Sequence, residues 1–492
     1  MLFNSLTYAI FLPIVFAIYW SLRNNYKWQN IFLLLASYVF YAWWNWRFLG
    51  LLVGMSLVSW IGGKYISMAS NMANASEGGG RCLFVKKLLL VSIVILDIMV
   101  LGAFKYYNFF VGGFADLFGL QNSIHSLKIV LPLGISFFTF QAIAYIVDVY
   151  KHKIESTNLI DCLLYIGFFP KLLAGPIERP TNLIPQIQKP RVFEYDLAVD
   201  GCRQILWGLF KKVVIADNCA LYVNQVYSDY ANQSGSTLLL AAILYTIQIY
   251  GDFSGYSDMA IGSAKLLGFR FRDNFLFPYF SRNMNEFWKR WHISLNTWFV
   301  DYVYIPLGGS RGGKWKTIRN IMIVFLLSGL WHGADWSFVA WGAYHGSLLV
   351  LLILLNRNIK YERVVAYDRC LPSIKEFGQM LLVFALATFG WMMFRADNMT
   401  QFIDYTHRMC SVDLLSIPKL SGYYILFANI ALMFVIEWFM RRQKHGCDFS
   451  HYTPYAIHPA IYTVMRYTLY AVVFILILLF GGHTENFIYM YF

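Results

Sequence analysis

The sequence predicts an all-α protein that crosses a membrane many times. Only 14% of its 492 residues are charged and 58% are hydrophobic, whereas soluble domains carry about 25% charged residues. Apolar stretches of roughly 20 residues, the length at which a helix crosses a bilayer core, recur along the chain. We therefore expect a polytopic protein embedded in the lipid bilayer, with about twelve transmembrane helices. The expected spans are 2–22, 29–43, 48–63, 88–107, 129–149, 204–227, 237–258, 320–334, 337–356, 376–394, 421–440 and 460–480.

The first span is expected to remain in the protein. It begins at Leu2, and neither a basic residue nor a small-residue cleavage site marks it as a signal peptide. No internal repeat or appended globular module is evident, so residues 1–492 are expected to form one membrane domain.

Basic residues gather in alternate loops, and this pattern predicts the orientation. Residues 108–127 and 228–236 contain no Lys or Arg, while the loops after the first, third and fifth spans are basic. Because Lys and Arg next to a span resist translocation, the basic loops should be cytoplasmic and both termini should face outward. The net charge of +13 is then a consequence of topology, and no nucleic-acid partner is expected.

Two apolar stretches do not fit as simple crossings. Residues 159–180 are interrupted by Pro170 and Gly175, and basic residues flank both ends. A re-entrant hairpin fits, because broken backbone at membrane depth is tolerated where it lines a buried or wet cavity. Residues 286–309 are also flanked by basic residues and should begin and end on the cytoplasmic side.

His332 is the first polar candidate, because an ionisable residue inside a membrane segment is costly. It lies about 13 residues into its span, roughly 20 Å of helical rise from the basic end. Gly329 and Gly333 leave room beside it. The imidazole is either a buried neutral group that joins helices or a general base that takes a hydroxyl proton near neutral pH.

Two further histidines qualify. At helical spacing, His292 shares a face with Trp288, Leu295 and Phe299, so it should point into the interior. The alternative is an interfacial amphipathic helix anchored by its tryptophans and cations. His345 either pairs with His332 or joins helices.

Carboxylates and a glycine-rich loop complete the polar candidates. Asp252 and Ser254 are expected where a span meets the cytoplasmic surface, either to orient a neighbouring histidine or cation or to cap the helix. The loop 308–315, GGSRGGKW, nearly matches a phosphate loop, but Trp315 replaces the hydroxyl residue and no strand precedes it. We expect a glycine-rich turn, and the weaker alternative is that its cations also bind the phosphates of a donor. Neither the scattered cysteines nor the histidines have metal-ligand spacing, so no metal is expected.

Several motifs together resemble the membrane-bound O-acyltransferase family, in its bacterial polysaccharide O-acetyltransferase branch (alginate and peptidoglycan O-acetyltransferases). They are FWKRWHISLNTWF, LSGLWHGADWSFVAWGAYHG, GISFFTFQAIAYIVDVY, AGPIERP, YGDFSGYSDMAIG and FRDNFLFPYFSRNMNEFW. The resemblance covers residues 1–350 best, and residues 351–492 supply C-terminal helices and an aromatic tail. It implies a ring of helices around a central tunnel, in the bacterial cytoplasmic (inner) membrane.

The resemblance also implies roles. His332 matches the family's catalytic histidine, and His292 matches its second polar position, near the donor. The tail ENFIYMYF, residues 485–492, resembles the C-terminus of this branch, in which Tyr489 would be an acyl relay; the alternative is an interfacial aromatic belt. Further candidates for binding the donor or substrate are Trp288, Arg290, Trp331, Asp252, Ser254, Arg311, Lys314 and His345.

The expected function is transfer of an acetyl group from a cytoplasmic thioester, acetyl-CoA or another acyl donor, to an extracytoplasmic polysaccharide hydroxyl or a partner transferase resembling SGNH hydrolases. No bound cofactor is expected. The first alternative is D-alanyl transfer from a carrier protein to a cell-envelope polymer. The second is a non-enzymatic transporter of a lipid-linked sugar, with the histidines as a proton relay.

Overall fold

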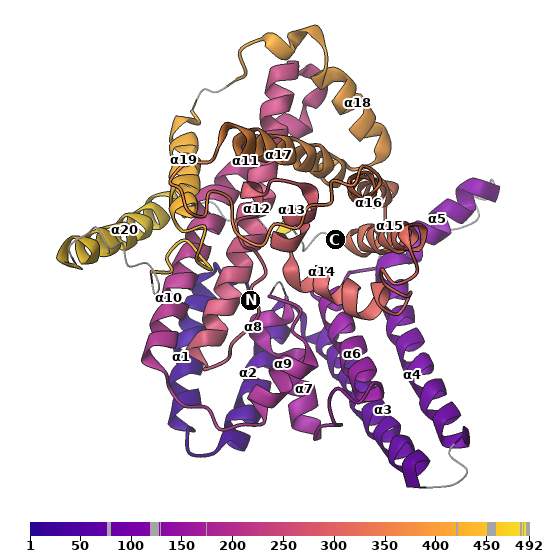
Figure 1. Ribbon diagram of the computed structural model, residues 1–492. Helices are drawn as coiled ribbons and strands as arrows, with labels where there is room; N and C mark the ends of the chain where they lie inside the picture. The colour runs from indigo at the N-terminus through magenta and orange to yellow at the C-terminus, as the bar shows by residue number, and fades with distance from the viewer. Residues whose placement is uncertain are drawn as a thin grey trace. The chain divides into compact units, whose positions relative to one another are not determined.

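The described parts of the chain are mainly helical, as predicted (Figure 1). The computed structural model describes residues 1–75, 80–118, 127, 129–173, 175–419, 422–449, 459–482, 485 and 487–488, and these residues form no strand. The chain divides into two compact units. The first contains residues 1–201 and 263–272, and the second contains residues 202–262 and 273–492.

The predicted multi-pass membrane character is confirmed. Within the described ranges, six helical segments are long and apolar enough to cross a membrane: Tyr26–Ala73, Gly80–Gly113, Gly235–Leu266, Trp336–Leu354, Ile374–Arg395 and Ala460–Phe480. Three shorter apolar helices lie at three more of the predicted spans: Leu6–Ser21, Ile135–Tyr150 and Tyr424–Phe439. The predicted spans 204–227 and 320–334 are helical but more polar, because their helices carry lysines and arginines.

The first unit is built around three helices that pack side by side, α3, α4 and α6 (Figure 1). Two adjacent glycines of α3 permit this. A Cβ atom on Gly62 would meet the Ile93 side chain of α4 at 2.0 Å, and one on Gly63 would meet Tyr145 of α6 at 2.8 Å. Small residues at such contacts allow close van der Waals packing within a membrane. The unit's helices are α1 (Leu6–Ser21), α2 (Tyr26–Asn45), η1 (Trp46–Phe48), α3 (Leu49–Ala75), α4 (Gly80–Leu101), η2 (Gly102–Tyr106), α5 (Tyr107–Phe118), α6 (Ile135–Tyr150), α7 (Leu159–Gly167), α8 (Phe169–Leu172) and α9 (Pro180–Ile187).

The stretch 159–180 is broken, as its proline and glycine predict. Helix α7 ends at Gly167, Phe168 is extended, and α8 is a single turn. Lys171 of α8 is fully buried, and its ammonium group donates to the side-chain oxygen of Gln141 on α6. The re-entrant orientation of this stretch stays a prediction.

The second unit holds most of the remaining helices. Helix α10 (Tyr195–Leu209) crosses from the first unit to the second after residue 201. Helix α12 crosses back into the first unit after residue 262 and ends at Leu266. The helices are η3 (Phe210–Ala216), α11 (Asp217–Ser228), η4 (Tyr230–Asn232), α12 (Gly235–Leu266), η5 (Pro278–Phe280), α13 (Met284–Arg290), α14 (Ile293–Phe299), η6 (Val300–Tyr304), α15 (Lys314–His332), α16 (Trp336–Leu354), α17 (Ile374–Arg395), α18 (Met399–Met409), η7 (Val412–Leu415), α19 (Tyr424–Phe439) and α20 (Pro459–Phe480).

Helices α15 and α16 form a tightly packed antiparallel hairpin. The turn is short because the Asp335 carboxylate caps α16 by accepting a hydrogen bond from the Ser337 N–H at 2.8 Å. Gly329 and Gly342 face each other across the hairpin. A Cβ atom on Gly329 would lie 2.2 Å from the Phe338 carbonyl oxygen, and one on Gly342 would lie 2.3 Å from that of Phe325. The two backbones are therefore in direct contact, and this contact fixes the end of α15.

Candidate active site

His332 is the last residue of α15, where Gly333 turns extended and ends the helix. Its side chain is buried among aromatic rings. The ring centroids lie 4.8 Å from Trp331, 5.0 Å from Trp341 and 5.2 Å from Phe394. The span predicted from the sequence continues to residue 334 and would place His332 inside a helix. The structure places it instead at a helix end, where a turn rather than a helical face sets its direction.

His292 does not lie on the face of a continuous helix, so the helical-spacing argument was wrong. Helix α13 ends at Arg290, and His292 adopts a left-handed conformation with φ of 44° before α14 begins. The break is held by backbone pairing, because Leu276 N–H donates to Arg290 C=O and Ile293 N–H donates to Asn274 C=O. This conformation is uncommon for a residue with a side chain, and such outliers occur often at functional sites.

Trp331 brings the two histidines into one aromatic cluster. Its ring centroid lies 4.8 Å from that of His332 and 6.0 Å from that of His292. Phe253 of α12 packs on the other side of His292 at 4.6 Å. The prediction that His332 and His292 belong to one site is thus consistent with the geometry, and their chemical roles stay predictions.

His345 has the surroundings of a residue that joins helices. It is fully buried against Trp288 of α13 at 4.9 Å and Trp341 of its own helix at 5.0 Å. Its Nε2 atom would lie 2.3 Å from a Cβ atom on Gly390, so α17 also packs against it. Trp341 contacts both His345 and His332, each with 5.0 Å between ring centroids.

Asp252 and Ser254 do not lie at a helix end, because α12 continues to Leu266. The acidic side chains are tolerated in the middle of this helix because lysine ammonium groups pair with them. The Lys212 ammonium lies 2.7 Å from a carboxylate oxygen of Asp252 and 2.7 Å from one of Asp217. Of the two predicted alternatives, capping the helix is wrong and orienting a cation is what the structure shows.

The neighbouring Lys211 pairs in the same way. Its ammonium donates to the Ser254 hydroxyl at 2.8 Å and lies 2.6 Å from Asp258. Neither lysine was among the predicted site residues, although two adjacent cations inside an apolar stretch are a visible signal. They lie on η3, a π-helical segment that packs against glycines of α12; a Cβ atom on Gly251 would lie 3.0 Å from the Lys211 carbonyl oxygen.

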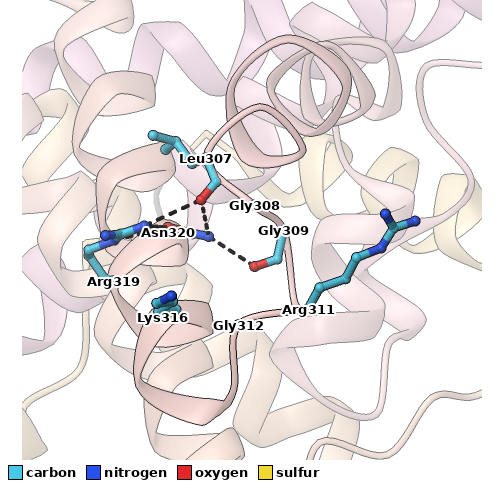
Figure 2. A pocket seen from close by; sticks show the side chains of 8 residues that line it. All are labelled: Leu307, Gly308, Gly309, Arg311, Gly312, Lys316, Arg319 and Asn320. Atoms are coloured by element: carbon cyan, nitrogen blue, oxygen red, sulfur yellow. Dashed lines mark hydrogen bonds between the residues drawn. The ribbon is translucent and has the colours of Figure 1, made fainter.

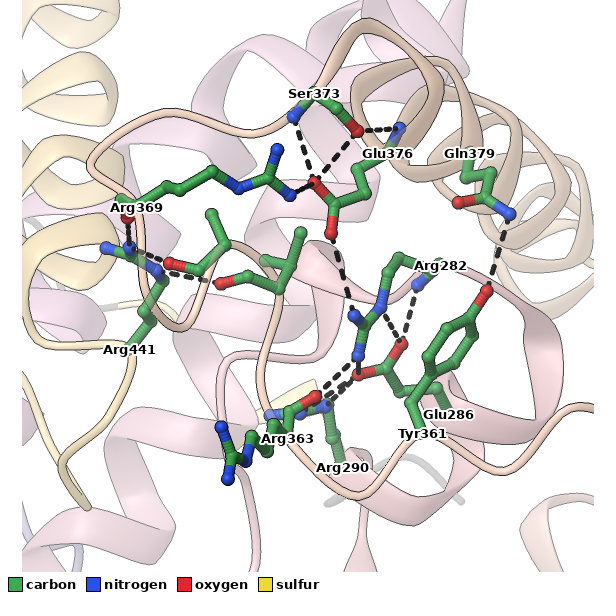
Figure 3. A network of polar contacts seen from close by, with 12 residues as sticks. Arg282, Glu286, Arg290, Tyr361, Arg363, Arg369, Ser373, Glu376, Gln379 and Arg441 are labelled. Atoms are coloured by element: carbon green, nitrogen blue, oxygen red, sulfur yellow. Dashed lines mark hydrogen bonds and ion pairs between the residues drawn. The ribbon is translucent and has the colours of Figure 1, made fainter.

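Arg290 is part of a network of ion pairs that braces the helix before His292 (Figure 3). Its guanidinium donates to Glu286 at 3.0 Å and to the Leu276 carbonyl at 3.2 Å. Glu286 also pairs with Arg282 at 3.0 Å, and Arg282 reaches Glu376 of α17 at 3.7 Å. The positive charge of Arg290 is therefore compensated within the protein. The predicted role of Arg290 in donor binding is untested.

The loop 308–315 forms a glycine-rich turn beside a pocket of about 390 Å³ (Figure 2). Gly308, Gly309 and Gly313 have positive φ angles of 102°, 58° and 89°, which side-chain-bearing residues rarely adopt. The pocket is lined by Leu307, Gly308, Gly309, Arg311, Gly312, Lys316, Arg319 and Asn320. Of the two cations predicted to meet the donor, Arg311 lines the pocket, whereas Lys314 is exposed and is not among the lining residues.

The pocket is cationic, and hydrogen bonds from Asn320 hold the turn that lines it. In the part of the chain that the structure describes, none of the acidic side chains forms an ion pair with Arg311, Lys316 or Arg319. The buried Asn320 amide donates to the carbonyls of Leu307 at 3.3 Å and Gly309 at 2.9 Å, which fixes the turn (Figure 2). Such a pocket favours an anionic ligand.

Two predictions lie beyond this geometry. Tyr489 is outside the described residues. Among the residues that are described, no group of three or more His, Cys, Asp or Glu side chains is arranged to hold a metal ion. The expectation that the protein needs no metal or bound cofactor stays a prediction.

Comparison with known proteins identifies the family. The model of the membrane-bound O-acyltransferase family matches residues 39–361. The chain is 40% identical over 405 residues to the probable alginate O-acetylase AlgI of Pseudomonas aeruginosa, covering 81% of this chain and 73% of that protein. It is 32% identical over 461 residues to the peptidoglycan O-acetyltransferase of Helicobacter pylori, covering 87% and 83%. It is also 32% identical over 244 residues to the teichoic acid D-alanyltransferase of Bacillus subtilis, covering 47% and 61%.

The matched segment includes His292, His332 and the glycine-rich turn, and it spans both structural units. The resemblance predicted from the sequence motifs is therefore confirmed. The chain belongs to the membrane-bound O-acyltransferase family and is an acyltransferase.

Proposed function

We propose that the protein transfers an acetyl group from acetyl-CoA to a hydroxyl of an extracytoplasmic polysaccharide, directly or through a secreted partner resembling SGNH hydrolases. Relatives that cover most of the chain are named alginate and peptidoglycan O-acetyltransferases, which supports this acyl group and acceptor class. The cytoplasmic membrane and the outward termini are part of the same proposal.

One observation carries the proposal: α15 joins a cationic pocket at its start to the histidine cluster at its end. Lys316 and Arg319 lie in its first turns and His332 is its last residue. At 1.5 Å per residue the helix separates Lys316 from His332 by about 24 Å. A donor held by its phosphates at the pocket would need a long flexible arm to reach His332, and coenzyme A has one.

His332 would act as the general base. Its imidazole takes the proton of the acceptor hydroxyl as the oxygen attacks the thioester carbonyl carbon. The carbon–sulfur bond then breaks, and the departing thiolate takes the proton back from the imidazolium. His292, held next to Trp331 by the backbone break, would stabilise the developing oxyanion or position the thioester.

The second candidate is D-alanyl transfer from a carrier protein. The similarity to a teichoic acid D-alanyltransferase over about half of the chain favours it. Here the exposed cations from Arg311 to Arg319 would bind an acidic carrier. The family assignment argues against the third candidate, a transporter without acyl chemistry.

The test is a matched pair of substitutions in protein reconstituted into vesicles. His332→Gln keeps a polar side chain of similar length but removes the base, so transfer from acetyl-CoA should fall by about 10²- to 10⁴-fold. His345→Gln makes the same change at a buried histidine outside the cluster and should retain most of the transfer. Equal transfer by both variants would refute the base assignment. Turnover of a D-alanyl carrier thioester, without turnover of acetyl-CoA, would favour the second candidate.

A further inference from the structure

Three described residues near the C-terminus, Glu485, Phe487 and Ile488, contact α12 and η3 of the second unit. The Ile488 N–H donates to a carboxylate oxygen of Asp252 at 2.7 Å, and Lys212 donates to the Glu485 carbonyl at 3.0 Å. Phe487 packs on Tyr256 of α12 with 4.2 Å between ring centroids. Phe487 and Ile488 are both buried. These residues lie more than 200 positions from α12 in sequence, yet one hydrogen bond and a ring contact bind them to α12, and a second hydrogen bond binds them to Lys212 of η3.

The segment that contains these three residues supplies hydrogen-bond partners to two buried charged side chains, Asp252 and Lys212. Lys212 is one cation between two carboxylates, and the side chains of Lys212, Asp217 and Asp252 are each at most 2% exposed. One Asp252 oxygen faces Lys212, and the other accepts the Ile488 N–H. Because a buried charge is costly unless its hydrogen-bonding capacity is filled, the docked segment completes the ion cluster.

The docking site adjoins the histidine cluster. Phe253 lies between them, with its ring 6.0 Å from Phe487 and 4.6 Å from His292. His292 in turn lies 6.0 Å from Trp331, which contacts His332. Phe487 is therefore one aromatic ring away from the site at which the acyl group is expected to react.

We propose that Lys212 and Asp252 are positioning residues, which hold the segment that contains Glu485, Phe487 and Ile488 beside the histidine cluster so that the acyl group passes to the acceptor rather than to water. The inference rests on the proposed function. With the segment docked, the attacking oxygen belongs to the acceptor and the thioester yields an acetyl ester and free thiol. With the segment released, water attacks the same carbonyl and the products are acetate and free thiol.

The experiment changes the segment and leaves the buried charges in place. Ile488→Pro removes the N–H that Asp252 accepts, and Ile488→Val is the matched control that keeps it. Phe487→Ala weakens the docking through the ring contact with Tyr256 and serves as a second, independent variant. Each full-length protein is reconstituted with acetyl-CoA and acceptor polysaccharide. Thiol release, acetylated polymer and free acetate are then measured alongside hydrogen–deuterium exchange of the C-terminal peptide.

A hydrogen bond from a main-chain N–H to a carboxylate changes an equilibrium by about ten- to a hundredfold. We therefore expect amide exchange in the C-terminal peptide to rise by that order in Ile488→Pro and Phe487→Ala, with Ile488→Val like wild type. The ratio of acetylated polymer to acetate should fall by a similar factor while thiol release persists.

Unchanged product ratios in both disrupting variants would overturn the proposal, whether or not the exchange rises. A loss of thiol release in proportion to polymer acetylation would also overturn it, because the segment would then support the fold rather than direct the acyl group. If the wild type releases no thiol from acetyl-CoA, the proposed function fails instead, and the exchange data still decide whether the segment docks.

Discussion

Replacing Gly342 with alanine should push α15 and α16 apart and disturb His332 without touching it. The added Cβ atom would lie 2.3 Å from the Phe325 carbonyl oxygen, and such contacts are essentially never closer than 3.0 Å. The helices must therefore separate locally by at least 3.0 − 2.3 = 0.7 Å. The obstacle is backbone, which cannot rotate out of the way as a side chain can.

The energetic cost can be isolated with a control on the same helix. Overpacking of a well-packed interior costs about 1–3 kcal/mol, and Gly→Ala inside a helix gains about 1 kcal/mol. Gly346→Ala receives the same gain, but its Cβ atom meets the Met322 sulfur at 2.9 Å, which lies near the end of a flexible side chain. The Cβ atom on Gly346 also meets the Phe325 Cβ atom at 3.2 Å, a milder contact than 2.3 Å to a carbonyl oxygen. The difference between the two variants, up to about 1–3 kcal/mol, therefore reports mainly the backbone contact.

The assay compares stability and turnover in the same detergent or vesicle preparation. Thermal unfolding should show Gly342→Ala less stable than Gly346→Ala. Trp341, next to Gly342, contacts His332 at 5.0 Å, and a shift approaching 1 Å in a reacting group lowers turnover by up to about 10²-fold. Wild-type turnover and stability in Gly342→Ala would refute the reasoning that direct backbone packing of the hairpin sets the position of His332.

The remaining predictions concern the donor pocket and the tail. Asn320→Leu removes the amide that donates to the Leu307 and Gly309 carbonyls, and the loss of such buried hydrogen bonds costs about 1–3 kcal/mol. The KM for acetyl-CoA, measured by thiol release, should rise by about tenfold or more, with a smaller change in kcat; an unchanged KM would separate the pocket from donor binding. Tyr489→Phe should lose polymer acetylation but retain donor hydrolysis, and full acetylation by this variant would leave the tail as an aromatic anchor.

The membrane fold could be predicted because span length and the cost of burying charge act on local sequence. The same cost selected His332 and His292 as candidates, and their chemical roles stay predictions. Local sequence could not predict the break at His292, because no glycine or proline marks it. The break depends on backbone pairing with residues 274–276, a partner that helical periodicity does not reveal.

Lys211 and Lys212 show a different limit. Their position inside an apolar stretch was visible, but the partners that make it tolerable lie on α12 and near the C-terminus. An ammonium group placed in a membrane segment is stable only when its charge and its donors are matched. The sequence therefore indicates that partners must exist, and only the fold identifies Asp252 and the Glu485 carbonyl among them.

Both histidines of the cluster lie at helix ends, and this explains how the protein fixes the directions of their side chains. A side chain within a continuous helix takes the direction that the helical period gives it, so neighbouring turns limit its placement. At a helix end, backbone contacts from elsewhere set the direction: the Gly329–Gly342 contact for His332 and the 274–276 pairing for His292. These contacts belong to different helices, so the cluster forms only when α12, α13 and the α15–α16 hairpin are packed together. Activity should therefore be more sensitive to the small residues at these contacts than to many residues that line the site.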